Sequence, residues 1–110
     1  MYRQGDILLK KVESLPELED FNISSIEGNE VENTIILALG EATGHAHAIR
    51  NHNGNAVLVK SKHENKFFLM VLNEVKLTHE EHAAITLPIG NYEFVRQREY
   101  SPIEIRQVAD

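Results

Sequence analysis

The sequence contains no cysteine and no long apolar run. The lack of cysteine excludes disulfides, zinc–thiolate sites and thiol catalysis, and it is typical of a cytosolic protein. No stretch approaches the roughly 18 apolar residues that a membrane span requires. Arg3 and Asp6 precede any long apolar run, which argues against a signal peptide. We therefore expect a soluble, cytoplasmic protein with a single domain over residues 1–110.

Basic residues are absent from much of the first half. Between Val12 and Ile49 there are eight acidic residues and no lysine or arginine, and the net charge of the whole chain is −6. This balance argues against general affinity for nucleic acid. From Arg50 onward there are eight basic and eight acidic residues, so a local anion-binding site in the second half is compatible with the sequence.

Short apolar segments separated by turn residues predict a mainly β fold. We expect a strand pair joined by the turn at Asn53-Gly54, and a second strand pair joined at Pro88 and Gly90. The segment 13–30 is predicted to be a loop, with one helical turn after Pro16. The main predicted strands cover residues 6–12, 34–39, 45–50, 56–61 and 91–99. This pattern is typical of a small barrel or sandwich.

The end of the chain predicts one short helix. Ser101 can cap it, Pro102 suits its first position, and Glu104 has the spacing of a capping box. We therefore expect a C-terminal helix over residues 102–109.

The segment "GHAHAI" places His45 and His47 on one face of a predicted strand, because alternate residues share a face. Small alanines on the opposite face indicate close packing there. Two neutral imidazoles at this spacing can bind one Zn, Mn, Fe or Ni ion, although two surface histidines would show the same pattern. Thr43 adds a hydroxyl group beside the pair and is a candidate ligand-binding residue.

A second histidine segment, "THEEH", spans residues 78–82. His82 is a candidate third metal ligand, Glu81 a candidate general base, and His79 a candidate catalytic residue. Three such ligands with open coordination positions are the usual form of a catalytic metal centre. The alternative is a solvated polar turn. His52 and His63 are expected to be ordinary surface histidines.

The segment "YEFVRQREY" places Arg96, Arg98 and Tyr100 on the same strand face as Phe94. A guanidinium group is suited to carboxylate or phosphate, so these three residues could bind an anionic ligand. Alternatively, each arginine pairs with an acidic residue of this acidic chain.

Several motifs together resemble a family of small bacterial and phage proteins. They are "MYRQGD", "GEATGHAH", "HEEHAAI", "LPIGNYEF" and "RQREYSP", and they cover most of the chain apart from residues 13–33. The resemblance brings no settled activity and therefore implies no reaction.

A partial resemblance to cupins rests on Gly40, His45 and His47, and on Pro88 and Gly90. It implies a small β-barrel with a metal site. The chain departs from the cupin pattern at two ligands: Asn51 or His52 stands at the glutamate position, and Glu93 stands at the third histidine position. A cupin-like site would need His82, His79 or Glu93 as replacement ligands.

The leading hypothesis is a divalent metal site that hydrolyses an anionic small molecule or nucleotide. Two alternatives stay open beside it. One is a metal-free histidine–arginine phosphodiesterase, and the other is a non-catalytic module that binds or sequesters an anionic ligand. A structural protein with incidental histidines is a further reading. A homodimer through exposed strand edges is also compatible with the sequence.

Overall fold

The computed structural model describes residues 1–27, 30–40 and 44–96. These residues form ten β-strands and no helix, which confirms the mainly β prediction. The strands are β1 (Tyr2–Gln4), β2 (Ile7–Val12), β3 (Leu18–Asp20), β4 (Thr34–Leu39), β5 (Ala46–Arg50), β6 (Ala56–Ser61), β7 (Phe67–Val71), β8 (Val75–Leu77), β9 (Ile85–Leu87) and β10 (Gly90–Arg96). The predicted C-terminal helix over 102–109 lies outside the described residues. The described part contains no helix long and apolar enough to cross a membrane.

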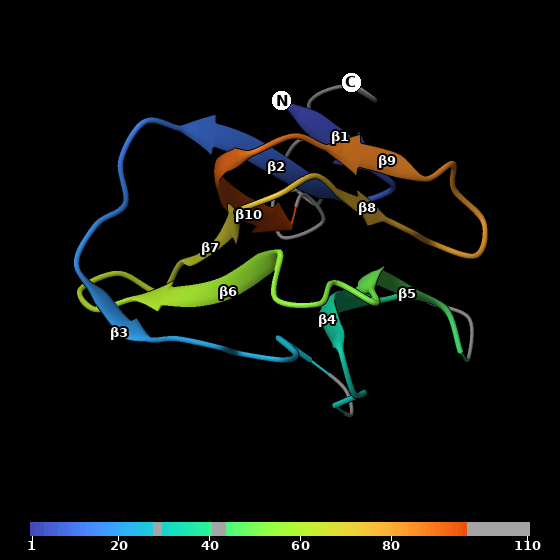
Figure 1. Cartoon of the computed structure of the whole chain (residues 1–110), viewed down its shortest axis with the longest axis horizontal. Helices are drawn as coiled ribbons and strands as arrows, with labels where there is room; N and C mark the ends of the chain where they lie inside the picture. The colour runs from blue at the N-terminus through green and yellow to red at the C-terminus, as the bar shows by residue number, and fades with distance from the viewer. Residues whose placement is uncertain (28–29, 41–43, 97–110) are drawn as a thin grey trace, which may run out of the picture.

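The largest sheet has six antiparallel strands in the order β1-β2-β10-β7-β6-β3 (Figure 1). Strand β10 lies between β2 and β7, so a late segment of the chain joins an early hairpin to the middle of the sequence. This position brings Arg96, at the end of β10, opposite Ile7 and close to the turn that connects β1 and β2. That turn contributes to the candidate site.

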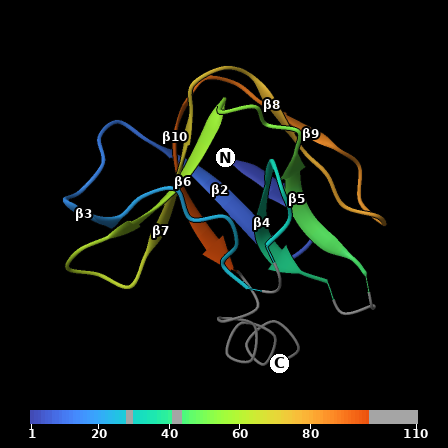
Figure 2. The ribbon, with the colours of Figure 1, turned by 60° about the horizontal axis from the view of Figure 1, so that its bottom comes forward.

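Two further strand pairs, β4-β5 and β8-β9, lie beside the main sheet. Ala48 and Thr78 join them: the Ala48 amide donates to the Thr78 carbonyl at 3.0 Å, and the Thr78 amide donates to the Ala48 carbonyl at 2.8 Å. Figure 2 shows these four strands on one side of the molecule and β3 and β7 on the opposite side. The described strands do not close into a barrel, so the barrel implied by the cupin resemblance is not observed.

The core lies between the main sheet and the two strand pairs. Leu69 on β7, Ile49 on β5 and Leu77 on β8 are all fully buried or nearly so, and they belong to one continuous apolar cluster. Ala46 and Ala48 pack with Ile36 in a smaller cluster, as expected from the small residues on that face. Apolar contact therefore holds the histidine-bearing segments of β5 and β8 against the main sheet.

The predicted hairpin of residues 45–50 and 56–61 is wrong, although both strands exist. Strand β5 pairs with β4, whereas β6 pairs with β7 and β3. Asn51, Asn53 and Gly54 all have positive φ angles. The backbone amide of Asn53 donates a hydrogen bond to Asn33 Oδ1 at 2.8 Å, which ties the linker to the start of β4. The linker therefore carries the chain from one sheet to the other instead of closing a two-residue turn.

Two smaller corrections follow from the same topology. Strands β9 and β10 flank Pro88 but pair with β8 and with β2 and β7, so they do not form the predicted strand pair. The segment after Pro16 forms the short edge strand β3 instead of a helical turn. Each partner was fixed by long-range packing, which local turn residues do not specify.

Candidate functional site

The two histidine segments meet in the folded chain. We call His45, His47, His79 and His82 the histidine cluster. His79 is its centre, because its ring centroid lies 4.3 Å from that of His47, 4.6 Å from that of His82 and 5.7 Å from that of His45. The rings of His47 and His82 are 6.0 Å apart.

The bridge between β5 and β8 explains this convergence. Ala48 lies opposite Thr78 in an antiparallel pair, so continuing that register places His47 opposite His79, and Ala46 opposite Glu80. The contacts agree with this register, since the Ala46 amide donates to Glu80 Oε1 at 2.8 Å. At the next position, His45 Nδ1 lies 3.3 Å from Glu81 Oε1. Segments about 34 residues apart thus meet at the site by facing each other beyond one β-bridge.

Gln4 fixes the orientation of His47. The Gln4 side-chain amide nitrogen donates to the carbonyls of Leu77 and Ala83, at 3.0 Å each, so its oxygen must face the other way. That oxygen lies 2.9 Å from His47 Nδ1. Because an amide oxygen only accepts hydrogen bonds, Nδ1 carries the hydrogen and Nε2 faces Asp6, whose Oδ1 is 3.4 Å away.

His47 is neutral at pH 7. Its side chain is almost fully buried, and this burial, together with the neighbouring His79, lowers the pKa of His47 to about 4. His82 and Arg96 act in the same direction, whereas Asp6 opposes the shift. Neutral His47 therefore presents a lone pair at Nε2.

Two glycines make room for the histidine rings. Gly5 has φ +59°, and a Cβ at this position would lie 2.8 Å from His82 Nε2 and 3.1 Å from His47 Cε1. At Gly40, a Cβ would lie 2.7 Å from His45 Cβ and 3.0 Å from His79 Nε2. Larger residues at these positions would displace the rings.

His45, His79 and Glu80 form a group that could hold a metal ion. One ligand atom from each lies within 4.8 Å of the others. His79 Nδ1 accepts a hydrogen bond from the Glu81 amide at 3.0 Å, which leaves Nε2 for other contacts. The Ala46 amide lowers the pKa of Glu80 by hydrogen bonding to its carboxylate. His45 Nδ1 is buried and makes no hydrogen bond, despite the nearby Glu81 oxygen.

The predicted site residues divide into three groups: those that lie together, Arg96, and those outside the described residues. His45, His47, His79, His82 and Glu81 lie together, although the three-residue metal group contains His79 and Glu80 in place of His47 and His82. The metal roles of His47 and His82, and the catalytic roles of His79 and Glu81, stay predictions. The third group consists of candidates outside the described residues: Thr43, Arg98 and Tyr100.

Arg96 is held by acceptors of the protein itself. Its Nε donates to Asp6 Oδ2 at 3.2 Å, its Nη1 donates to Glu27, and its Nη2 donates to the Leu39 carbonyl at 3.0 Å. Burial would lower the pKa of Arg96, but Glu27 and Asp6 outweigh it and raise the pKa. Burial would raise the pKa of Asp6, yet the hydrogen bond and charge of Arg96 lower it. Arg96 thus pairs with acids, as the alternative reading of the sequence expected, and its anion-binding role stays a prediction.

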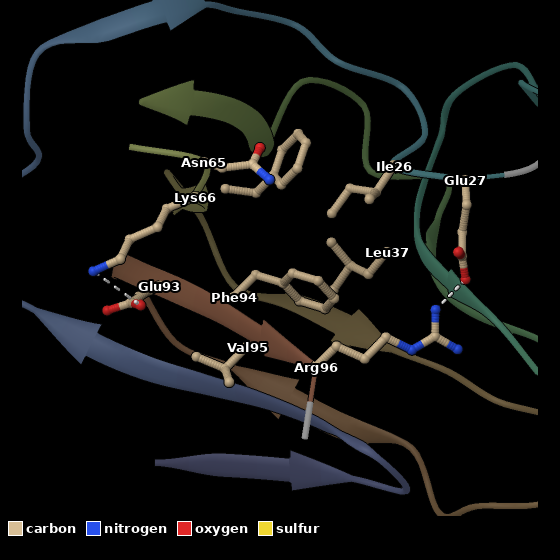
Figure 3. A pocket seen from close by; sticks show the side chains of 10 residues that line it. Ile26, Glu27, Leu37, Asn65, Lys66, Glu93, Phe94, Val95 and Arg96 are labelled. Atoms are coloured by element: carbon tan, nitrogen blue, oxygen red, sulfur yellow. Dashed lines mark hydrogen bonds and ion pairs between the residues drawn. The ribbon is translucent and has the colours of Figure 1, made fainter. Parts of the chain in front are cut away.

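A cavity of about 270 Å³ opens beside the cluster. Its lining residues are Asp6, Leu39, Gly40, His47, His79, Glu81, His82 and Arg96. A second cavity, of about 280 Å³, is lined by Phe94 and Leu37, and the Arg96 side chain extends along it to Glu27 (Figure 3). Arg96 therefore lines both cavities.

The sequence reasoning missed the contributions of Gln4, Asp6, Glu27 and Glu80. Gln4 and Asp6 flank Gly5 in the turn between β1 and β2, and the string "QGD" was visible only as a turn. No periodicity or spacing connects this turn with histidines more than 40 residues away. Glu80 was visible as part of "THEEH", but no local pattern distinguished it from Glu81.

Comparison with curated proteins and with solved structures gives no match. A family profile described as "Domain of unknown function (DUF8820)" matches residues 3–97. The matched range contains the whole histidine cluster together with Gln4, Asp6 and Arg96. Because this range covers most of the 110 residues, the chain belongs to the DUF8820 family.

Proposed function

We propose that the histidine cluster binds a divalent metal ion, with His45, His79 and Glu80 as its ligands. Two imidazoles and one carboxylate suit Zn, Mn, Fe or Ni and leave coordination positions open. The observation that supports this most is the buried His45 Nδ1 without a hydrogen bond. An unsatisfied buried polar atom costs about 1–3 kcal/mol, and a ligand at the site would remove this cost.

The charges around the cluster support a dication. Four carboxylates, from Asp6, Glu27, Glu80 and Glu81, lie in or beside the site. Two guanidinium groups accompany them, because Arg96 pairs with Asp6 and Glu27, and Arg50 lies 3.7 Å from Glu80. The four carboxylates and two guanidinium groups leave an excess of two negative charges, which favours a cation at this site.

The proposed reaction is hydrolysis of an anionic small molecule or nucleotide that enters the cavity beside His79. A bound metal would act as a Lewis acid and lower the pKa of a coordinated water to about 7. Glu81 is exposed and close to His45, so its carboxylate can accept a proton at the cavity wall. His82 lies at the same wall and can donate a hydrogen bond to an anionic group of the substrate.

The two other readings differ from this proposal in their chemistry. A metal-free acid–base reaction requires a histidine that titrates near pH 7, and the low pKa of His47 counts against that residue in this role. A non-catalytic binding module would keep the metal or an anionic ligand without turnover.

Metal analysis of protein purified without an affinity tag tests the proposal. We expect about one or more equivalents of Zn, Mn, Fe or Ni by mass spectrometry, and a loss of metal affinity in Glu80→Gln and His45→Ala. Glu80→Gln is the sharper variant, because glutamine can still accept the hydrogen bond from the Ala46 amide. His63→Ala is the control, since His63 is exposed and pairs with Glu17. A protein that binds none of the four added metals would overturn the proposal.

A further inference from the structure

A second arrangement of ligand atoms lies between His47 and Asp6. It uses neither His45 nor Glu80 and therefore does not depend on the metal position proposed above. Asp6 comes from the turn between β1 and β2, whereas His47 lies on β5. Both residues line the cavity of about 270 Å³.

The hydrogen bonds around His47 determine which of its ring nitrogens is available. Both amide hydrogens of Gln4 are used by backbone carbonyls, so Gln4 accepts the hydrogen of His47 Nδ1. Nε2 is therefore the ring nitrogen that faces Asp6 Oδ1, 3.4 Å away. Such an outer hydrogen bond is what holds a metal-binding histidine in one tautomer and one orientation.

The distance between these two facing atoms matches that between two ligands of a shared cation. His47 Nε2 and Asp6 Oδ1 are 3.4 Å apart, whereas a charge-assisted N–H···O bond is usually about 2.7–2.9 Å long. Two ligand atoms that each lie about 2.1 Å from a tetrahedral zinc are about 3.4 Å apart. Arg96 donates to the other oxygen of Asp6 and keeps the carboxylate in place, as an outer partner of a ligand would.

His82 is the candidate third ligand at this position. Its ring stacks against that of His47, with an angle of 15° between the planes, and Gly5 lets both rings approach the turn. His82 is exposed, so a change of rotamer can bring its Nε2 towards Asp6. The remaining coordination positions would face the cavity and be open to water or an anionic ligand.

We infer that His47 Nε2 and Asp6, with His82, form a second binding position for a divalent transition-metal ion, which shares no ligand with His45 and Glu80. Two neighbouring cations would suit a ligand with several anionic oxygens, such as a phosphate ester.

Titration of chelator-treated protein with Co²⁺, followed by visible absorption and calorimetry, tests the inference. We expect two equivalents in the parent protein and one in Asp6→Asn, which can still accept the hydrogen bond from Arg96 but places an amide donor or a neutral oxygen opposite His47. His82→Ala is expected to weaken one equivalent by at least about 10-fold. His82 is exposed, so this variant keeps the test decisive if Asp6→Asn does not fold.

The variants separate this inference from the proposed function. If Glu80→Gln loses one equivalent and Asp6→Asn loses the other, both positions exist. If Asp6→Asn alone loses metal while Glu80→Gln binds normally, the second position stands and the first fails. One equivalent that Asp6→Asn and His82→Ala leave unchanged would overturn the inference. A single equivalent that Asp6→Asn and Glu80→Gln both remove would also overturn it, because the two positions would then be one.

Discussion

Replacing Gly5 with alanine tests whether this glycine is required by the backbone or by the histidine rings. Gly5 has φ +59°, and an L-residue with a side chain pays about 1–2 kcal/mol for this left-handed conformation. Gly54 has φ +78° and nothing within 4 Å of the position a Cβ would take. Gly54→Ala therefore carries the backbone cost alone and is the matched control.

The two alanine variants should lose similar stability but differ in metal binding. At Gly5 the new methyl group would meet the far end of His82, an exposed side chain that can move at little cost to stability. That movement would displace His82 and press on the buried His47 ring, from which a Cβ would be only 3.1 Å away. We expect a loss of about 1–2 kcal/mol in both variants, and a loss of about 10–100-fold in Co²⁺ affinity only in Gly5→Ala.

Urea unfolding in chelator gives the free energies, and Co²⁺ titration gives the affinities. Equal Co²⁺ affinity in Gly5→Ala and Gly54→Ala would refute the reasoning, because it would show that the approach of Gly5 to the rings has no bearing on the site. A loss of much more than 2 kcal/mol in Gly5→Ala alone would contradict the assumption that His82 can move aside.

Three further predictions concern stability. Arg96→Met should cost about 3 kcal/mol in urea unfolding, because it leaves the carboxylates of Asp6 and Glu27 without their shared partner; an unchanged midpoint would contradict this. Leu69→Ala should cost about 2–5 kcal/mol, since Leu69 is fully buried on β7, whereas an exposed leucine such as Leu72 should tolerate alanine within about 0.5 kcal/mol. For His47, the folded-state pKa of about 4 lies below the ordinary 6.5, so the unfolded chain binds more protons between these values. Stability in chelator should therefore fall by up to about 3 kcal/mol as the pH drops from 6.5 to 4, and His47→Gln should flatten this slope; the same slope in both proteins would argue against the shift.

The sequence located most strands but not their partners. Apolar and β-branched residues mark 34–39 and 56–61 as strands, and the structure has β4 and β6 at these positions. The partners depend on the linker at 51–55, where two asparagines and Gly54 adopt positive φ angles. An Asn-Gly pair permits such angles in a hairpin and equally in a link between two sheets, so local chemistry alone could not separate the two.

The site was accessible to sequence reasoning only in part. The His-x-His spacing placed His45 and His47 on one face because strand geometry fixes that periodicity. The central position of His79 depends on the register in which Ala48 meets Thr78, and this register follows from packing between β5 and β8. The participation of Gln4 and Asp6 depends on β10 and β2 pairing in the main sheet, which brings Arg96 to the first turn of the chain.

An anomalous difference map from crystals grown with zinc, recorded on both sides of the zinc edge, tests the metal assignment most directly. We expect a peak about 2 Å from a ring nitrogen of His45, a ring nitrogen of His79 and a carboxylate oxygen of Glu80. Zinc found only at His52 and His63, which lie outside the histidine cluster, would contradict it if the cluster held no zinc at saturating metal.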